Sequence, residues 1–378
     1  MDPLSSSLVK STTRKIPEGI LPSNYEGSLV DISVKCKGPD DIVYKQNRLL
    51  WEKIPRGYTR LELNGGNSEV VIYANHKFDY QMHHPIGDDE TYDRIVAVEK
   101  MNGEAAHFSG RYIGDEFYFI AGSKKTHIIF QNEDHIKLYN DDVNVYARTI
   151  ATALLDKFNS MPSYKQEDLK GFLSTTKVTA VMEILLPDNQ HIVQLEEGPN
   201  ELVGLFFTKQ PPLSDITTLL AYPFEAGMEV FEDFEFTVPN FEYVDYIEDH
   251  RQEVRSRKYT EGVVYFLQNT AEDTIGVIKQ KSKWYAHIRA LRQQAQYALR
   301  VKPPIEWAKE QSRNRMETLQ GYTYTTDMEL SEWMDISDKW IEYATKNIQH
   351  KDEVSCNFPS TWNKFIEECN ILHDYDVC

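Results

Sequence analysis

The chain changes its hydrophobic pattern once, near residue 283. From about residue 31 to residue 285, apolar residues mostly alternate with polar ones in short runs that turns separate, which is typical of β-strands. This pattern predicts strands at residues 58–63, 105–111, 116–121, 178–186, 191–195, 201–208, 262–268 and 274–278. Turns are expected at residues 113–115 and 187–189. One helix, at residues 143–158, is expected to interrupt these strands.

After Lys283 the apolar residues recur with a helical period. Trp284, Ile288, Leu291, Ala295 and Ala298 lie on one stripe of the helix that this period predicts. Pro303 and Pro304 end that helix, because proline lacks the amide hydrogen and restricts the preceding residue.

Three further helices are predicted at residues 305–319, 328–348 and 361–372. We therefore expect an α+β protein with antiparallel sheets and flanking helices. Its expected parts are a flexible N-terminal tail at residues 1–30, a large domain at 31–302 and a small all-helical domain at 303–378.

Composition places the chain inside the cell. Hydrophobic residues make up 41% of its 378 residues, enough for a large core. Four scattered cysteines are typical of a reducing compartment. No apolar run approaches the roughly 20 residues that a membrane span needs. We expect a monomer in the cytoplasm or the nucleus, with no membrane contact.

Charge is distributed unevenly along the sequence. The formal net charge is −18, which argues against a general affinity for nucleic acid. Residues 225–250 hold nine carboxylates and no Lys or Arg, whereas residues 251–302 hold eleven Lys and Arg against four acids. A compact basic stretch in an acidic protein indicates a local anionic ligand.

Five features in sequence order are candidates for chemistry. They are Pro55-Arg56-Gly57, Lys100-Met-Asn-Gly103 followed by Lys124, Glu183 in an apolar strand, Glu261-Gly262 at the start of a strand, and Lys279-Gln-Lys281. Strand spacing directs Lys279 and Lys281 to one face. Alone, each feature has an ordinary structural explanation, such as a surface lysine or an edge strand protected by charge. Their joint occurrence in this order favours a functional site.

The chemistry that these residue types suit is nucleotidyl transfer. A lysine such as Lys100 attacks a phosphate only when it is neutral, so nearby positive charge or a metal must lower its pKa. Lys279 and Lys281 supply such charge and suit an α-phosphate. Glu261 suits a divalent cation. Glycine at position 103 would let a nucleotide approach the backbone.

Two further contacts complete this hypothesis. Glu183 suits a pair of ribose hydroxyl groups. Arg56 offers a bidentate fork to an anionic group such as a 5′-phosphate or the triphosphate tail.

These motifs resemble those of the covalent nucleotidyltransferase superfamily, which contains ATP-dependent ligases and RNA capping enzymes. The wider resemblance rests on Lys100-Met-Asn-Gly103, Glu261-Gly-Val-Val264 and Lys279-Gln-Lys281. Within the superfamily, the chain is most similar to the first type of RNA ligase of T-even bacteriophages, over residues 41–292.

Three longer strings carry this narrower resemblance. Lys279-Gln-Lys-Ser-Lys-Trp-Tyr285 resembles the family's Lys-x-Lys-Ser-x-Trp-Tyr. The segment from Met182 to Val193 resembles its Phe-Glu-Phe … Pro-Thr-Asn-Arg-Ile-Val. Arg56-Gly57 followed by Asn75-His-Lys77-Phe78 resembles its Arg-Gly … Glu-Lys-Phe.

The resemblance implies a nucleotidyltransferase fold at residues 31–302 and an ATP-dependent RNA ligase that repairs RNA. Such an enzyme seals 5′-phosphate and 3′-hydroxyl RNA ends, single-stranded or at a nicked loop, through lysyl-AMP and AppRNA intermediates. The implied nucleophile is Lys100, and the implied metal site around Mg²⁺ or Mn²⁺ includes Glu261. The other residues implied to contact ATP are Arg56, Lys77, Lys124, Glu183, Lys279 and Lys281. Lys125, next to Lys124, is an alternative to Lys124 as the residue that contacts ATP. Trp284 or Tyr285 is a candidate to pack near the site, in the core or against RNA bases.

The chain also departs from the family pattern. Asn102 stands where an acid is common, and His191 replaces an arginine. Alternatives within the superfamily are a capping guanylyltransferase and a DNA ligase, although no linker into an OB-fold precedes the helical tail. An RNA-binding relative without activity and an adenylyltransferase that acts on protein are further alternatives.

Overall fold

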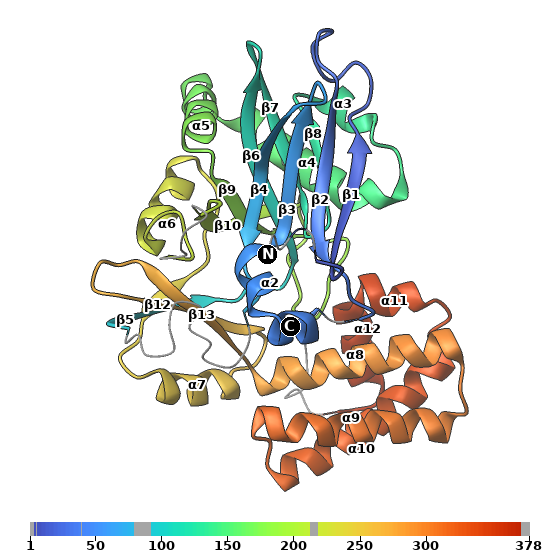
Figure 1. Cartoon of the computed structure of the whole chain (residues 1–378). Helices are drawn as coiled ribbons and strands as arrows, with labels where there is room; N and C mark the ends of the chain where they lie inside the picture. The colour runs from blue at the N-terminus through green and yellow to red at the C-terminus, as the bar shows by residue number, and fades with distance from the viewer. Residues whose placement is uncertain (1–3, 5, 39, 79–91, 212–217, 372–378) are drawn as a thin grey trace.

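The computed structural model describes residues 4, 6–38, 40–78, 92–211 and 218–371. Within these residues the protein combines three antiparallel sheets with helices, which confirms the expected α+β class. Two of the sheets lie against each other in the upper part of Figure 1, and the third lies below them beside a group of C-terminal helices.

The first sheet has the strand order β1-β2-β3-β4. Its strands are β1 (Val9–Lys15), β2 (Gly27–Val34), β3 (Arg56–Leu63) and β4 (Asn67–Asn75). Strand β1 pairs with β2 in register from Val9 opposite Val34 to Lys15 opposite Ser28. The expectation of a flexible tail at residues 1–30 is therefore wrong for this segment. The Ser/Thr-rich sequence of this segment has few apolar residues and therefore did not predict a strand. The segment forms an edge strand in which exposed side chains alternate with partly buried ones.

The second sheet has the order β10-β9-β6-β7-β8. Its strands are β6 (Glu104–Ile113), β7 (Glu116–Ser123), β8 (Thr126–Phe130), β9 (Thr179–Leu185) and β10 (Glu201–Thr208). The predicted strands at 105–111, 116–121, 178–186 and 201–208 are confirmed to within a few residues at each end. These strands are buried along most of their length, so they are recognisable as short apolar runs that turn residues bound.

The third sheet has the order β11-β5-β12-β13. Its strands are β5 (Arg94–Glu99), β11 (Phe241–Tyr243), β12 (Gly262–Gln268) and β13 (Thr274–Lys281). The long hairpin β12–β13 runs from Gly262 opposite Lys281 to Gln268 opposite Thr274. It brings the start of β12 and the end of β13, with their charged residues, to the same place.

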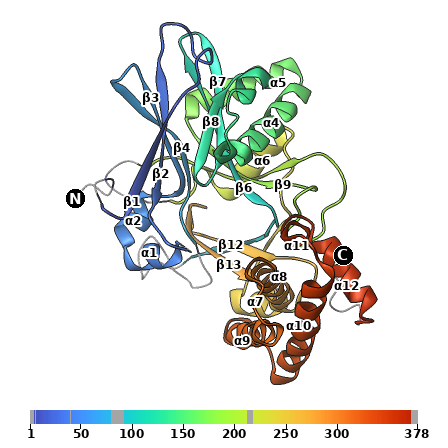
Figure 2. The ribbon, with the colours of Figure 1, turned by 90° about the vertical axis from the view of Figure 1, so that its right-hand side faces the viewer.

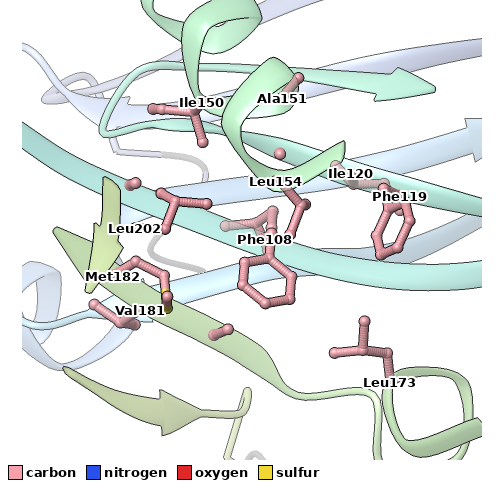
Figure 3. Packing of buried hydrophobic residues seen from close by; sticks show 14 of the residues in the cluster. Phe108, Phe119, Ile120, Ile150, Ala151, Leu154, Leu173, Val181, Met182 and Leu202 are labelled. Carbon is pink, nitrogen blue, oxygen red and sulfur yellow. The ribbon is translucent and has the colours of Figure 1, made fainter. Parts of the chain in front are cut away.

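Helices cover the outer face of the second sheet, so the upper part of the molecule has three layers (Figure 2). These helices are α4 (Val145–Ser160), α5 (Ser163–Thr176) and α6 (Phe224–Asp233). Phe108, Phe119, Leu154, Leu173 and Met182 belong to the buried cluster that joins sheet and helices (Figure 3). Burial of such side chains is the main stabilising contribution, at roughly 1.5–3 kcal/mol each.

The expectation of a single helix before residue 283 is wrong. Apart from α4, α5 and α6, this part contains α1 (Asp41–Gln46), α2 (Arg48–Lys53), α3 (Glu133–Lys137), the short 3₁₀ helix η2 (Asp142–Asn144) and α7 (Ile247–Ser256). Most of these are short, and short helices present too few turns for their period to show in the sequence.

The C-terminal helices are α8 (Lys283–Val301), α9 (Ile305–Thr323), α10 (Asp327–Asn347), α11 (Lys351–Cys356) and α12 (Phe358–Glu368). The fully buried side chains of Trp340 and Trp362 lie at the centre of their common core. Residues of α8, such as Ile288 and Leu291, belong to the same core. Helix α8 therefore joins the two parts: it continues directly from β13, and it packs with the helices that follow. The domain boundaries at residues 30 and 302 stay predictions.

A membrane-crossing helix is absent from the part of the chain that the structure describes.

Candidate active site

The tetrapeptide Lys100–Gly103 is the connection between two sheets. Strand β5 ends at Glu99 in the third sheet, and strand β6 begins at Glu104 in the second. The amide of Lys100 still donates to the carbonyl of Gly262 at 2.9 Å, so the backbone at the lysine is anchored to β12. The lysine side chain therefore emerges where the two sheets meet.

A cavity of about 790 Å³ opens at this junction. Every residue that the sequence analysis predicts for the site lines it: Arg56, Lys77, Lys100, Gly103, Lys124, Glu183, Glu261, Lys279 and Lys281. Among the described residues, the lining has eight Lys and Arg against five Asp and Glu. A cationic cavity in a chain of net charge −18 is a selective place for an anion.

Glu261 is the centre of the charge arrangement. Its Oε1 lies 3.1 Å from Nζ of Lys100 and 2.8 Å from Nζ of Lys281. The carboxylate is only 6% exposed, and the two lysine side chains are 20% and 10% exposed. The β12–β13 register explains the second contact, because Gly262 stands opposite Lys281. Two ammonium groups thus share one buried carboxylate.

Burial and the nearby carboxylates shift the pKa values of Lys100 and Lys281 in opposite directions. Burial lowers the pKa of Lys100, but the carboxylates of Glu261 and Glu183 outweigh it and leave that pKa above its usual value. Burial lowers the pKa of Lys281 to about 8, against the attraction of Glu261. From the sequence, Lys279 and Lys281 were expected to lower the pKa of Lys100. That pKa is raised instead, because the charges of Glu261 and Glu183 outweigh burial and the repulsion of Arg289.

Asn102 is a site residue whose importance sequence reasoning missed. Its Nδ2 donates to Oε2 of Glu261 at 2.9 Å and to the hydroxyl of Tyr285 at 3.0 Å. Its Oδ1 accepts from the backbone amides of Ile192 and Val193 at 3.1 and 3.0 Å. One buried amide therefore uses all four of its hydrogen-bonding positions and joins three segments of the chain.

We predict that Asn102→Ala lowers the free energy of unfolding by about 3 kcal/mol, because it leaves buried partners without hydrogen bonds. Asn102→Asp is expected to cost at least as much, since it places a second carboxylate against Glu261. Urea unfolding measures both. The matched control is Asn240→Ala, whose side chain donates to Glu99 on the surface. An Asn102→Ala loss no larger than that of the control would contradict this role.

Glu183 approaches the lysine tetrapeptide from β9. Its Oε1 accepts from the backbone amide of Gly103 at 3.0 Å. Burial and the charge of Glu261 raise the pKa of Glu183, although Lys100 and Lys124 act against this shift. A Cβ at position 103 would overlap the carbonyl oxygen of Ile184. The close approach of β9 therefore requires glycine here, a reason different from the nucleotide contact expected from the sequence.

Arg56 and Lys77 lie on the side of the cavity that the first sheet forms. Nε of Arg56 lies 2.9 Å from Asp40, and Nζ of Lys77 lies 3.0 Å from Asp40 and 2.8 Å from Asp41. Both carboxylates were missed, because nothing in the local sequence marks them.

Lys124 lies in the turn between β7 and β8. The structure places Lys124 in the cavity lining and leaves Lys125 exposed. Burial and the charge of Arg56 lower the pKa of Lys124.

The strand predicted at residues 191–195 is wrong. This segment is a loop, because the amides of Ile192 and Val193 bond to the Asn102 side chain rather than to a neighbouring strand. His191 lines the cavity from this loop, with its Nε2 3.5 Å from Glu104.

The basic stretch at residues 251–302 is divided by the fold. Helix α7 places Arg251 and Arg257 in surface ion pairs with acidic neighbours such as Glu248 and Glu253. Arg289 and Arg292 on α8 line the cavity together with Lys279 and Lys281. Tyr285 lines the cavity too, whereas Trp284 is buried in the helical core. Only the second half of the stretch therefore faces the candidate site.

A divalent cation fits this donor set only together with a ligand. The described residues contain no group of three or more His, Cys, Asp or Glu side chains that could hold a metal ion. Mg²⁺ commonly binds through one or two carboxylates, with water and phosphate oxygens completing its shell. Glu261, whose carboxylate lies between Lys100 and Lys281, fits that role once phosphate groups engage the lysines.

Comparison with known proteins identifies the family. The fold and the site define a mixed α+β protein with a lysine-lined cavity between two sheets. A family model described as a domain of unknown function, DUF7920, matches residues 26–292, and the chain belongs to this family. No curated protein sequence matches the chain.

Two similar solved structures are an archaeal ATP-dependent RNA ligase in forms 1 and 2, each 13% identical to this chain. The match to form 1 has a TM-score of 0.48 and covers 95% of this chain and 83% of the form 1 chain. The match to form 2 has a TM-score of 0.46 and covers 81% of this chain and 76% of the form 2 chain.

Proposed function

We propose that this protein is an ATP-dependent RNA ligase that uses Lys100 as its nucleophile. The observation that carries this proposal is the contact of Lys100 and Lys281 with one buried carboxylate, that of Glu261, in a cationic cavity. Residues from β3, β9 and β13 converge on it with the connections after β4, β5 and β7. Such convergence of chemically matched residues is what a phosphate-transfer site requires.

The cavity has room and chemistry for a nucleoside triphosphate. One part of its lining is apolar and includes Val98, Val264 and Phe266, which suits a nucleobase. The cationic part, with Lys279 and Lys281 on one strand, suits the phosphates. Glu183 borders the lysine tetrapeptide and suits the ribose hydroxyl groups.

The proposed first step transfers AMP to the protein. The neutral Nζ of Lys100 attacks the α-phosphorus of ATP, a P–N bond forms, and the bond to pyrophosphate breaks. Lys281 stabilises the charge that develops on the α-phosphate oxygens. Phosphates that attract Lys281 would also loosen its hold on Glu261, which leaves the carboxylate free to receive the proton or to bind Mg²⁺ or Mn²⁺. A bound cation supplies charge that lowers the pKa of Lys100.

Two further transfers complete the proposed ligation. An oxygen of a 5′-phosphate RNA end attacks the phosphorus on Lys100, which gives an AppRNA end and returns the lysine. A 3′-hydroxyl group then attacks the 5′-phosphorus, forms the phosphodiester and releases AMP.

The rate of AMP transfer to the protein is expected to rise with pH and to level off above about pH 8. Below its raised pKa, the neutral fraction of Lys100 grows tenfold for each pH unit. Above about pH 8, Lys281 loses the proton that makes it useful to the α-phosphate. Single-turnover rates with saturating ATP measure this profile. A rate that falls steadily from pH 6 to pH 9 would contradict the proposed protonation states.

The acceptor is tested with preformed protein–AMP. Labelled protein is freed of ATP and mixed with 5′-phosphate RNA, the same DNA sequence, or RNA with a 5′-hydroxyl. The proposal expects label to move to the 5′-phosphate RNA and a sealed strand when a 3′-hydroxyl end is present. Labelling by GTP in place of ATP would indicate capping chemistry, and transfer only to DNA would indicate a DNA ligase.

A further inference from the structure

A second cavity of about 610 Å³ lies next to the lysine-lined one. It lies among α8, α9 and α11, and it shares Gln293, Gln296 and Ser355 with the first cavity. The two cavities therefore adjoin along these three residues.

One side of α8 connects the two cavities. Arg289, Arg292, Gln296 and Arg300 follow one another at spacings of three or four residues, so they lie on one face of the helix. At 1.5 Å per residue, this face runs about 17 Å from Arg289 to Arg300. Cationic groups stand at both ends, and amide side chains lie between them.

Two aromatic rings border the second cavity. Tyr297 is 36% exposed and Trp307 is 39% exposed, with ring centroids 5.9 Å apart. Neither ring belongs to the core that α8–α12 share. The guanidinium carbon of Arg300 lies 5.9 Å from the centroid of the Tyr297 ring. Large rings left this exposed in a pocket are available to stack on a planar ligand.

The charge of the second cavity also differs from that of the whole chain. Its described lining contains Arg300 and Lys351 and no Asp or Glu. Glutamine side chains, which both donate and accept hydrogen bonds, form much of the remainder. Exposed rings, amides and cations without carboxylates suit the bases and phosphates of a single strand of nucleic acid.

We propose that the second cavity binds the single-stranded RNA segment that leads to the end held near Lys100. We name its lining the α8 groove: Gln293, Gln296, Tyr297 and Arg300 on α8, with Trp307 on α9. This inference rests on the proposed function. It assigns part of RNA recognition to α8 and α9, at the second cavity.

The test measures affinity for a fluorescent single-stranded RNA with a 5′-phosphate, by anisotropy, with the full chain. Trp307→Ala is expected to weaken binding roughly tenfold, because one ring–base contact is lost. Arg300→Ala is expected to weaken binding too and to lower the slope of affinity against salt by about one. The controls are Tyr164→Ala on α5 and Lys137→Ala on α3, exposed residues that line neither cavity.

Formation of protein–AMP from labelled ATP, without RNA, is measured on the same samples and reports on the first cavity. Weakened RNA binding with AMP formation preserved supports the α8 groove. RNA affinities of Trp307→Ala and Arg300→Ala equal to those of the controls overturn it, and so does tighter binding of the same sequence as DNA. If the wild type forms no AMP yet the groove variants lose RNA, the proposed function fails and the groove stands. If Trp307→Ala does not fold, Arg300→Ala, a change at an exposed position, decides the outcome alone.

Discussion

Lys100→Arg is expected to abolish covalent attachment of AMP while the protein stays folded. Arginine keeps the positive charge that Glu261 holds at 3.1 Å, so the buried carboxylate retains a partner. A guanidinium group stays protonated at any ordinary pH and therefore cannot attack a phosphate. Autoradiography after incubation with α-labelled ATP measures the loss, which should reach the detection limit.

Comparison of Lys100→Arg with Lys100→Ala separates the effect of losing the nucleophile from the effect of losing the charge. Lys100→Ala removes both, so it should abolish labelling and also release Glu261 to pair with Lys281 alone. Lys125→Ala, a change of an exposed lysine, is the matched control and should label like the wild type. Labelling of Lys100→Arg at the wild-type level would show that another residue carries the nucleotide.

Glu261→Gln is expected to affect both stability and chemistry. The substitution leaves the ammonium groups of Lys100 and Lys281 buried without their carboxylate, at a cost of about 3 kcal/mol in the free energy of unfolding near pH 7. The cost should shrink as pH rises through about 8, because Lys281 then becomes neutral. Urea unfolding at pH 7 and at pH 9 measures both effects.

The same variant should slow AMP transfer by roughly 10²- to 10³-fold, because the amide can neither take the proton of Lys100 nor bind the metal ion as a carboxylate does. Glu253→Gln is the matched control, since Glu253 also pairs with Arg257 and His250 but is 55% exposed. Exposed pairs contribute at most about 1 kcal/mol. A stability loss for Glu261→Gln as small as that of the control would contradict the buried triad of charges.

Much of the fold follows from local patterns. Strands β6, β7, β9, β10, β12 and β13 and helices α4, α9 and α10 lie where hydrophobic periodicity predicts them. The spacing of apolar residues indicates which side chains of a helix or strand are buried, and this spacing is clear in the sequences of these elements. Helix α6 escaped prediction because most of it lies in the acidic segment, where carboxylates separate its buried apolar residues Phe224, Met228 and Phe231.

The residues of the candidate site were also predictable only in part. Lysines and glutamates in motifs could be found from sequence, because they occur in a recognisable order and some, such as Lys279 and Lys281, have strand spacing. Asn102, Asp40 and Asp41 could not, since their importance comes from contacts with residues far along the chain. The loop at residues 191–195 shows the limit of pattern most clearly. Its apolar residues resemble a strand, yet its amides donate to the side chains of Asn102 and Gln190.

The central claim is that Lys100 carries AMP, and mass spectrometry of the digested protein tests it most directly. The protein is incubated with ATP and Mg²⁺, denatured, digested and analysed for peptides that gain the mass of one adenylyl group. We predict that the modification lies on Lys100 alone and disappears when pyrophosphate is added before denaturation. An adenylyl group on any other residue, or none on a protein shown to bind ATP, would contradict the account.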